Sequence, residues 1–178
     1  MSTPRNPRLA ARNVLPTLLS IAFLAALPAA TLADSGRAMP QPVPAAYTQE
    51  CASCHMAYPP GLLPARSWQR LMGGLERHYG SDASLDAATR QPIDAWLQAN
   101  AGTYKRVAEE PPQDRITRSA WFARKHRQID PAVWQLASVR SAAQCAACHT
   151  DAERGRFDDD ALRVPAGLPA SQRRAWLD

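Results

Sequence analysis

The chain has 178 residues, with 21 Lys and Arg against 16 Asp and Glu, and its formal net charge is +5 at pH 7. Three arginines and no acidic side chain lie between Met1 and Ala33, so the rest of the chain carries a net charge of only +2. The remaining basic residues are scattered along the sequence, which argues against a nucleic-acid-binding protein. The part beyond Ala33 is long enough for one or two small domains.

The segment from Met1 to Ala33 has the pattern of a secretory signal peptide. Arg5, Arg8 and Arg12 precede a mostly apolar stretch, Val14 to Leu27, and Thr31-Leu32-Ala33 forms a candidate cleavage site. The apolar stretch is short for a membrane span, which needs about 20 residues, and an uncleaved membrane anchor is the alternative. No later segment is apolar enough to cross a bilayer. We therefore expect an exported protein whose mature chain has no transmembrane segment.

The elements that follow begin with an extended arm over residues 34–46, which are rich in Pro and Ala. A short helix is expected from Tyr47 to His55. Residues 59–64 include three prolines and a glycine, which predict an irregular loop.

Two longer helices are expected next. Ser67 is predicted to cap a helix that runs to about Tyr79, with Gly80 at its C-terminal end. Trp68, Leu71, Leu75 and His78 share one face of that helix. Ser84 is predicted to open another helix that runs to about Ala101, with Pro92 dividing or ending it.

The Glu109-Glu110-Pro111-Pro112 run predicts a domain boundary, between an N-terminal domain over 34–110 and a C-terminal domain over 111–178. Thr117 or Ser119 is expected to cap a helix in which Phe122, His126 and Ile129 share a face. A new segment starts at Pro131, and a helical turn is expected from Ser141 to His149. Asp158 to Asp160 are interpreted as a solvated turn rather than a cation site. Residues 166–178 receive no role. These elements predict a mainly α fold, made of two small domains with short helices and long loops.

All four cysteines lie in two Cys-x-x-Cys-His pentapeptides, at residues 51–55 and 145–149. Two thiols at this spacing lie on one face of a helical turn, so they can add to the two vinyl groups on one edge of a porphyrin. The histidine that follows is positioned to bind the iron. The motifs therefore predict two covalently attached haem c groups, held by Cys51, Cys54, Cys145 and Cys148.

The two histidines outside the motifs are His78 and His126. Two haem irons have four axial positions, and His55, His78, His126 and His149 together would fill all four. His78 follows His55 at the same separation in sequence at which His126 precedes His149. The simplest assignment pairs His55 with His78 and His126 with His149, and crossed pairing between the two halves is the alternative. An iron with both axial positions filled passes electrons but has no free site for a substrate.

Two other roles would also account for the cysteines. Two disulfides would explain an even number of cysteines in an exported protein, and a zinc ion would take all four thiolates. Neither explains why a histidine follows each pair. Met72 is a possible sulfur ligand only if its helix breaks at Gly73-Gly74. Four tryptophans are candidates either for the walls of the haem sites or for ordinary core: Trp68, Trp96, Trp121 and Trp134.

The chain resembles the dihaem cytochrome c family over residues 47 to 165. In the first half the resemblance rests on Tyr47-x-x-Glu50-Cys51-x-x-Cys54-His55-x-x-Tyr58-Pro59-Pro60, Leu63-Pro64, Ser67-Trp68 and His78-Tyr79-Gly80. In the second half it rests on Ile116-Thr117, Trp121-Phe122, Lys125-His126 and Cys145-x-x-Cys148-His149-x-Asp151-Ala152-Glu153-x-Gly155.

This resemblance implies a periplasmic electron carrier, not an enzyme, in which two histidines bind each haem. It also implies two partners, an oxygen-binding monohaem c-type cytochrome and a membrane b-type cytochrome. A haem enzyme or gas-binding protein that uses a labile distal histidine is the alternative function. A third hypothesis is a docking subunit of a larger membrane redox complex.

Overall fold

The computed structural model describes residues 39–176, which belong to a unit that spans Ala33–Asp178. The predicted signal peptide and the start of the predicted arm lie outside the described residues. Within them, no helix is long and apolar enough to cross a membrane. These residues form short α-helices and 3₁₀ helices, and β-pairing is limited there to isolated bridges. The predicted mainly α fold with short helices and long loops is confirmed. The boundary at residues 110 and 111 stays a prediction.

The first Cys-x-x-Cys-His motif begins in a helix and ends in a turn. Helix α1 spans Ala45–Cys51, so the helix predicted to reach His55 ends at the first cysteine instead. Ser53 gives a physical reason, because its hydroxyl donates to the Glu50 carbonyl at 2.9 Å. A side chain that occupies a carbonyl in this way competes with the next helical hydrogen bond. Cys54 and His55 consequently lie in a tight turn.

The single helix predicted from Ser67 to Tyr79 is instead two elements. Helix α2 spans Ala65–Met72 and follows Pro64, so the prediction of Ser67 as the cap is wrong. Pro64 is the N-cap residue of α2, has an extended backbone and makes no side-chain capping hydrogen bond. The helix ends at Gly73-Gly74, where each glycine costs about 1 kcal/mol relative to alanine. The 3₁₀ helix η2, Leu75–Arg77, then leads to His78.

Helix α3 spans Ala87–Ala99 and begins at Asp86 rather than at the predicted Ser84. The Asp86 carboxylate accepts hydrogen bonds from the backbone N–H groups of Ala88 at 2.9 Å and Thr89 at 3.0 Å. A carboxylate at this position satisfies the free N–H groups of the first turn, which fixes the start of the helix. Pro92 lies inside α3 and neither divides nor ends it.

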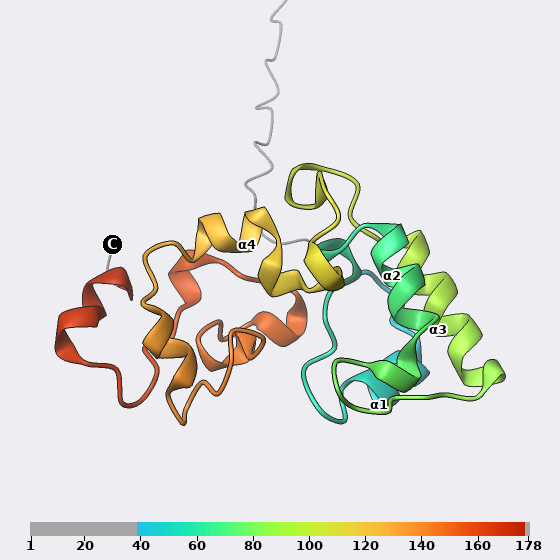
Figure 1. Ribbon diagram of the computed structural model, residues 1–178, viewed down its shortest axis with the longest axis horizontal. Helices are drawn as coiled ribbons and strands as arrows, with labels where there is room; N and C mark the ends of the chain where they lie inside the picture. Colours follow the sequence, from blue (N-terminus) through green and yellow to red (C-terminus); the bar gives the residue numbers. More distant parts are fainter. Residues whose placement is uncertain (1–38, 177–178) are drawn as a thin grey trace, which may run out of the picture. The chain divides into compact units, whose positions relative to one another are not determined.

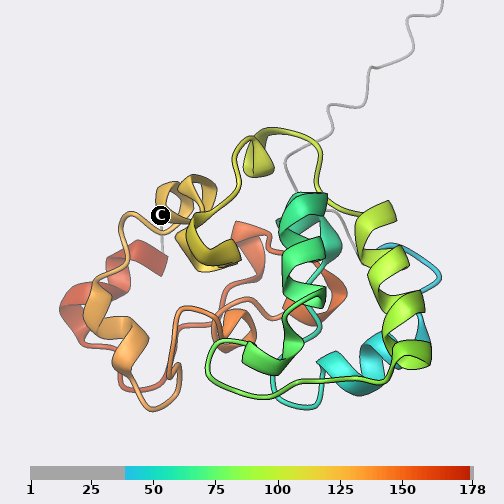
Figure 2. The same ribbon diagram turned by 45° about the vertical axis from the view of Figure 1, so that its right-hand side comes forward.

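Helices α1, α2 and α3 enclose the larger of two hydrophobic clusters, with α2 and α3 side by side (Figures 1 and 2). The indole N–H of Trp68 donates to the Pro60 carbonyl in the 3₁₀ helix η1, Pro60–Leu62, at 2.7 Å. Trp96 packs at the edge of the cluster against Tyr47, with ring centres 4.8 Å apart. Trp68, Trp96 and Met72 are thus residues of this core. Its buried members are Tyr47, Leu63, Trp68, Met72, Ile93, Leu97 and Ala101.

A segment of three short 3₁₀ helices connects α3 to the second half. These are η3, Lys105–Val107, then η4, Pro112–Asp114, and η5, Ile116–Arg118.

Arg70 on α2 binds this connecting segment. Its guanidinium donates to both carboxylate oxygens of Asp114, at 2.9 and 2.5 Å, and to Glu110 at 2.7 Å. The bidentate pair fixes the position of η4 relative to α2. The hydrogen bonds from Arg70 also hold the pKa of the Asp114 carboxyl below its usual value.

We expect Arg70→Gln to lower the free energy of unfolding by about 1 kcal/mol at pH 7, a modest loss because the ion pair is partly exposed to water. Since the folded-state pKa of Asp114 is lowered, the stabilisation is present above the unfolded-state pKa and is lost as pH falls through the folded-state value. Denaturant titrations of the holoprotein at pH 7 and at acidic pH measure the difference. Arg77→Gln is the control, since Arg77 pairs only with its exposed neighbour Glu76 in the described structure. If Arg70→Gln lowered the free energy of unfolding by the same amount at pH 7 and at acidic pH, the loss would not come from the ion pair between Arg70 and Asp114.

The second half begins with helix α4, Ala120–Lys125, and the predicted cap at Ser119 is confirmed. The Ser119 hydroxyl accepts a hydrogen bond from the Phe122 N–H at 3.1 Å. The helix ends before His126, so the prediction that Ile129 continues its face is wrong. The predicted segment at Pro131 is present as the 3₁₀ helix η6, Pro131–Gln135.

The remainder of the second half consists of single turns around a small core. The helical turn predicted from Ser141 to His149 is reduced to η7, Cys145–Ala147. It is followed by η8, Ala152–Arg154, η9, Asp159–Ala161, and η10, Ala170–Trp176. The tail, which has no predicted role, contributes to the core through Leu168 and Trp176. The buried members of this second cluster are only Val133, Val139 and Leu168.

Candidate functional site

The two histidines of the first half lie together. His55 follows α1 in the turn of the first motif, and His78 follows η2. Their ring centres are 6.1 Å apart, and the ring planes are inclined by 31°. Tyr58 and Tyr79 flank the pair, with ring centres 4.8 Å from His55 and 5.0 Å from His78 respectively.

One histidine of this first pair is oriented by the backbone. The Nδ1 of His55 lies 2.7 Å from the Met56 carbonyl, so Nδ1 carries the proton and Nε2 is the free electron-pair donor. The Nδ1 of His78 is buried and has no hydrogen-bond partner within the described residues. A metal-binding histidine usually donates its second N–H, which raises its basicity as a ligand. The first pair therefore contains one histidine held in this way and one without such a partner.

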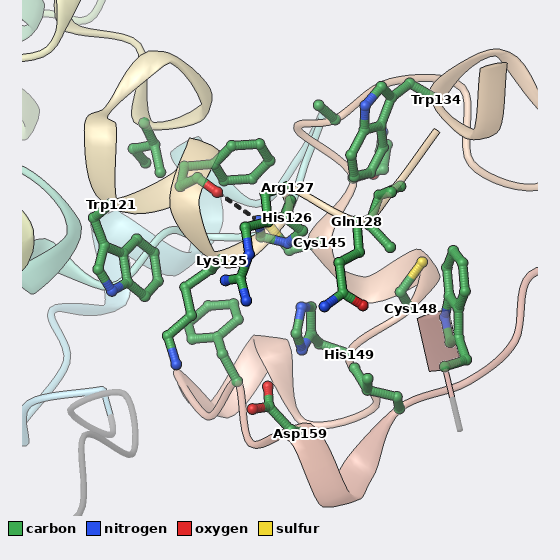
Figure 3. Close-up of a pocket in the computed structure, with 18 of the residues that line it drawn as sticks. Trp121, Lys125, His126, Arg127, Gln128, Trp134, Cys145, Cys148, His149 and Asp159 are labelled. Atoms are coloured by element: carbon green, nitrogen blue, oxygen red, sulfur yellow. Dashed lines mark hydrogen bonds between the residues drawn. The ribbon is translucent and has the colours of Figure 1, made fainter. Parts of the chain in front are cut away.

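The two histidines of the second half have the same spacing. His126 follows α4, His149 follows η7, and their ring centres are also 6.1 Å apart, with planes inclined by 81°. The Nδ1 of His126 lies 3.0 Å from the Phe122 carbonyl, the dashed line in Figure 3, whereas the Nδ1 of His149 is buried without a partner among the described residues. The Phe122 ring stacks on the His126 ring at 4.0 Å. The structure thus brings together the two local pairs.

A cavity of ≈ 490 Å³ surrounds the second pair. Its volume lies within the range of about 300–1,000 Å³ typical of pockets for small ligands and cofactors. Both cysteines of the second motif line it, together with His126 and His149 (Figure 3). Aromatic side chains from well-separated parts of the sequence form much of the remaining wall: Trp121, Phe122, Trp134, Phe157 and Trp176.

The residues of each site fit a haem. Metal–imidazole bonds are about 2 Å long, and each ligating nitrogen lies about 1 Å from its ring centre, so two axial imidazoles place their ring centres about 6 Å apart. Both histidine pairs have this spacing, at 6.1 Å. Burial lowers the pKa of His78, His126 and His149, which favours the neutral imidazole that binds iron.

The arrangement of the cysteines disagrees with the two alternative roles. The structure joins none of the four in a disulfide. Among residues 39–176, no three His, Cys, Asp or Glu side chains converge as a metal-binding group, and the two pairs therefore do not build a four-cysteine zinc site.

The sequence did not predict that three further residues contact the sites. Asp159 lies in the exposed turn expected from the aspartate run, but it also lines the second cavity. Trp176 reaches the same cavity from the tail, and a lone tryptophan in a polar tail is a signal that could have indicated this. Tyr58 carried no hint of its role beyond its place in the family motif.

Tyr58 connects the two sites. Its ring lies beside His55, and its hydroxyl donates to the carbonyl of Ala143 at 2.7 Å, just before Cys145 in the chain. Its own carbonyl accepts a hydrogen bond from the buried Tyr47 of the first core. Tyr58 therefore fixes the second motif against the first half of the chain.

We expect Tyr58→Phe to lower the free energy of unfolding by about 1–2 kcal/mol, because it removes a hydrogen bond between two elements distant in sequence and leaves the Ala143 carbonyl without that donor. Denaturant unfolding followed by the haem absorbance measures the loss. Tyr104→Phe is the control, since the Tyr104 side chain is largely exposed. Equal stability of the two variants would show that the hydrogen bond contributes nothing.

The chain is similar to known dihaem cytochromes. The family model described as dihaem cytochrome c matches residues 47–157, more than half of the chain. A search of curated proteins found no match. Among solved structures, a dihaem cytochrome c from Rhodobacter sphaeroides is 45% identical, with a TM-score of 0.57; the match covers 63% of this chain and 94% of that one. A dihaem cytochrome type c from Shewanella baltica is 40% identical, with a TM-score of 0.61; the match covers 70% of this chain and 96% of that one.

The family match extends over both Cys-x-x-Cys-His motifs and over all four histidines. Both solved structures are more than nine-tenths covered, and both carry two haems by name. The chain thus belongs to the dihaem cytochrome c family, and its cofactors are two covalently attached haem c groups.

Proposed function

We propose that the protein is an electron carrier in which both haem irons have two histidine ligands. His55 and His78 bind the first iron, and His126 and His149 bind the second. Cys51 with Cys54 and Cys145 with Cys148 form the thioether bonds. The observation that carries this proposal is the common spacing of 6.1 Å between the rings of both pairs, which matches two imidazoles on one iron.

The residues around each pair suit one-electron transfer. The haem supplies an iron that alternates between the ferric and ferrous states. His55 and His126 are held by the carbonyls of Met56 and Phe122, so their Nε2 atoms are preset for the iron. Two imidazoles stabilise the ferric state relative to His/Met ligation, which gives low reduction potentials. With both axial positions filled, a substrate finds no open coordination site.

The location and partners are also proposals. The signal-peptide pattern of residues 1–33 and the covalently attached haems support export to the periplasm. The family resemblance supports a monohaem c-type cytochrome and a membrane b-type cytochrome as redox partners. Co-purification of the tagged holoprotein from solubilised membranes tests the second partner, and recovery of a membrane cytochrome would also support the docking-subunit hypothesis.

A second candidate function, gas binding or haem enzymology, is favoured by one observation. The Nδ1 atoms of His78 and His149 have no hydrogen-bond partner among the described residues, and of these two only His78 lies outside a haem motif, so it lacks both that link and the support that backbone carbonyls give His55 and His126. A ligand without such support is more easily displaced by an incoming diatomic molecule.

A carbon monoxide titration of the reduced holoprotein separates the two functions. If two histidines bind each iron, carbon monoxide leaves the Soret band unchanged. Rapid stoichiometric binding with a shifted Soret band would support the gas-binding alternative. The His78→Ala variant is the positive control, because it opens one axial position and is expected to bind one carbon monoxide per protein.

A further inference from the structure

Trp121 on α4 has a buried polar atom without a partner. Its indole Nε1 is buried and has no hydrogen bond within the described residues. Leaving such a donor unpaired costs its full desolvation penalty, so an acceptor is expected beside it. By contrast, the equivalent atom of Trp68 is satisfied by the Pro60 carbonyl. The unpaired N–H of Trp121 therefore needs an explanation of its own.

The surroundings of Trp121 include the cavity of the second site. Trp121 lines the ≈ 490 Å³ cavity together with His126 and His149. The Arg106 guanidinium covers the indole ring, 4.6 Å from its centre, which restricts rotation of the ring. Lys125, one turn further along α4, lines the same cavity.

The position of the cysteines gives the orientation of the second haem. The two vinyl groups that react with cysteine lie on one edge of a porphyrin, and the two propionates lie on the opposite edge. In Figure 3, Cys148 lies on the far side of His149 from Trp121 and Lys125, whereas Cys145 lies beside His126. Trp121 and Lys125 thus lie away from the attachment at Cys148, where the opposite edge of the ring would lie.

We propose that the Trp121 indole N–H donates a hydrogen bond to a propionate carboxylate of the second haem, with the Lys125 ammonium as its counter-charge. Both interactions are charge-assisted, and the propionate satisfies a donor that is otherwise buried and unpaired. Trp121 is then a positioning residue that orients the ring and stabilises its negative edge. This inference rests on the proposed haem site at His126 and His149.

Nitrogen-15 NMR of the fully reduced wild-type holoprotein tests the hydrogen bond directly, because six-coordinate ferrous haem is diamagnetic. The Trp121 indole N–H, assigned by its disappearance in Trp121→Phe, is expected downfield and protected from solvent exchange. Trp134→Phe is the matched control, since it removes another indole of the same cavity and should leave the Trp121 signal in place. A Trp121 N–H that exchanges freely with solvent would overturn the proposal. Assignment of the same signal through its bonded and neighbouring protons in the wild-type protein keeps the measurement independent of how the variant folds.

Redox titration provides a second readout. Trp121→Phe and Lys125→Gln are each expected to shift the reduction equilibrium of one haem several-fold toward the ferric state, because the propionate charge is less compensated. The other haem should not shift. Absence of a shift in both variants, or equal shifts of both haems, would contradict the inference. If instead His126 and His149 did not bind the second haem, the spectrum of the reduced protein would show a high-spin haem, or the protein would lack one haem. These results differ from the outcomes that contradict the role of Trp121.

Discussion

The variant His78→Met is expected to have one haem whose reduction potential is raised by on the order of 100 mV, while the other haem is nearly unchanged. Axial ligands set haem potentials over a range of about 0.8 V, and methionine raises the potential relative to a second histidine. His78 lies against His55 and not against the second pair, so only the first haem should respond. A spectroelectrochemical titration that resolves the two potentials measures the shift.

His126→Met is the matched variant for the second site, and it should raise the reduction potential of the second haem. The double variant should raise both, with nearly additive shifts, because the two substitutions act on different irons. If both potentials of His78→Met equalled those of the wild type, His78 would not be an iron ligand. If His78→Met shifted the potential of the haem attached at Cys145 and Cys148, the pairing would be crossed rather than local.

The double substitution Cys145→Ala, Cys148→Ala is expected to remove one covalently attached haem and to unfold much of the second half. The hydrophobic cluster there has only three buried members among the described residues, Val133, Val139 and Leu168, and the cavity around His126 and His149 is larger than any side chain could fill. Without the haem, the apolar burial is too small to balance the conformational entropy of the chain. Mass spectrometry of the mature protein measures the lost haem, and hydrogen exchange measures the lost structure.

The mirror substitution Cys51→Ala, Cys54→Ala should have a milder structural effect. The first half retains the larger buried core between α1, α2 and α3, so exchange protection in α2 and α3 should persist. If both variants lost protection to the same extent, the different sizes of the two cores would not determine how much each half depends on its haem.

The haem motifs, the cap of α4 and the local grouping of the histidines could be predicted from the sequence because these features depend on short spacings. Prediction failed where a competing local interaction decides the end of an element. Ser53 takes the carbonyl that would continue α1, and Asp86 provides a stronger cap than Ser84. The glycines after Met72 end a helix whose apolar face continues in the sequence.

Other parts of the sites depend on contacts between residues distant in sequence. The hydroxyl of Tyr58 meets the Ala143 carbonyl 85 residues further along, and Trp176 reaches the second cavity from the tail. Neither residue lies on a periodic face that would have indicated its partner. The unpaired N–H of Trp121 is likewise visible only once its surroundings are known, although Trp121 itself was a candidate haem wall.

The account depends most on the claim that two imidazoles bind each iron, and the low-temperature EPR spectrum of the ferric holoprotein tests it most directly. We expect two separate low-spin signals. The ring planes of His55 and His78 differ by 31°, which favours a rhombic signal, whereas those of His126 and His149 differ by 81°, which favours a more anisotropic one. A near-infrared charge-transfer band typical of bis-imidazole ligation should accompany both. A high-spin ferric signal that accounts for one haem of the pair would contradict the claim.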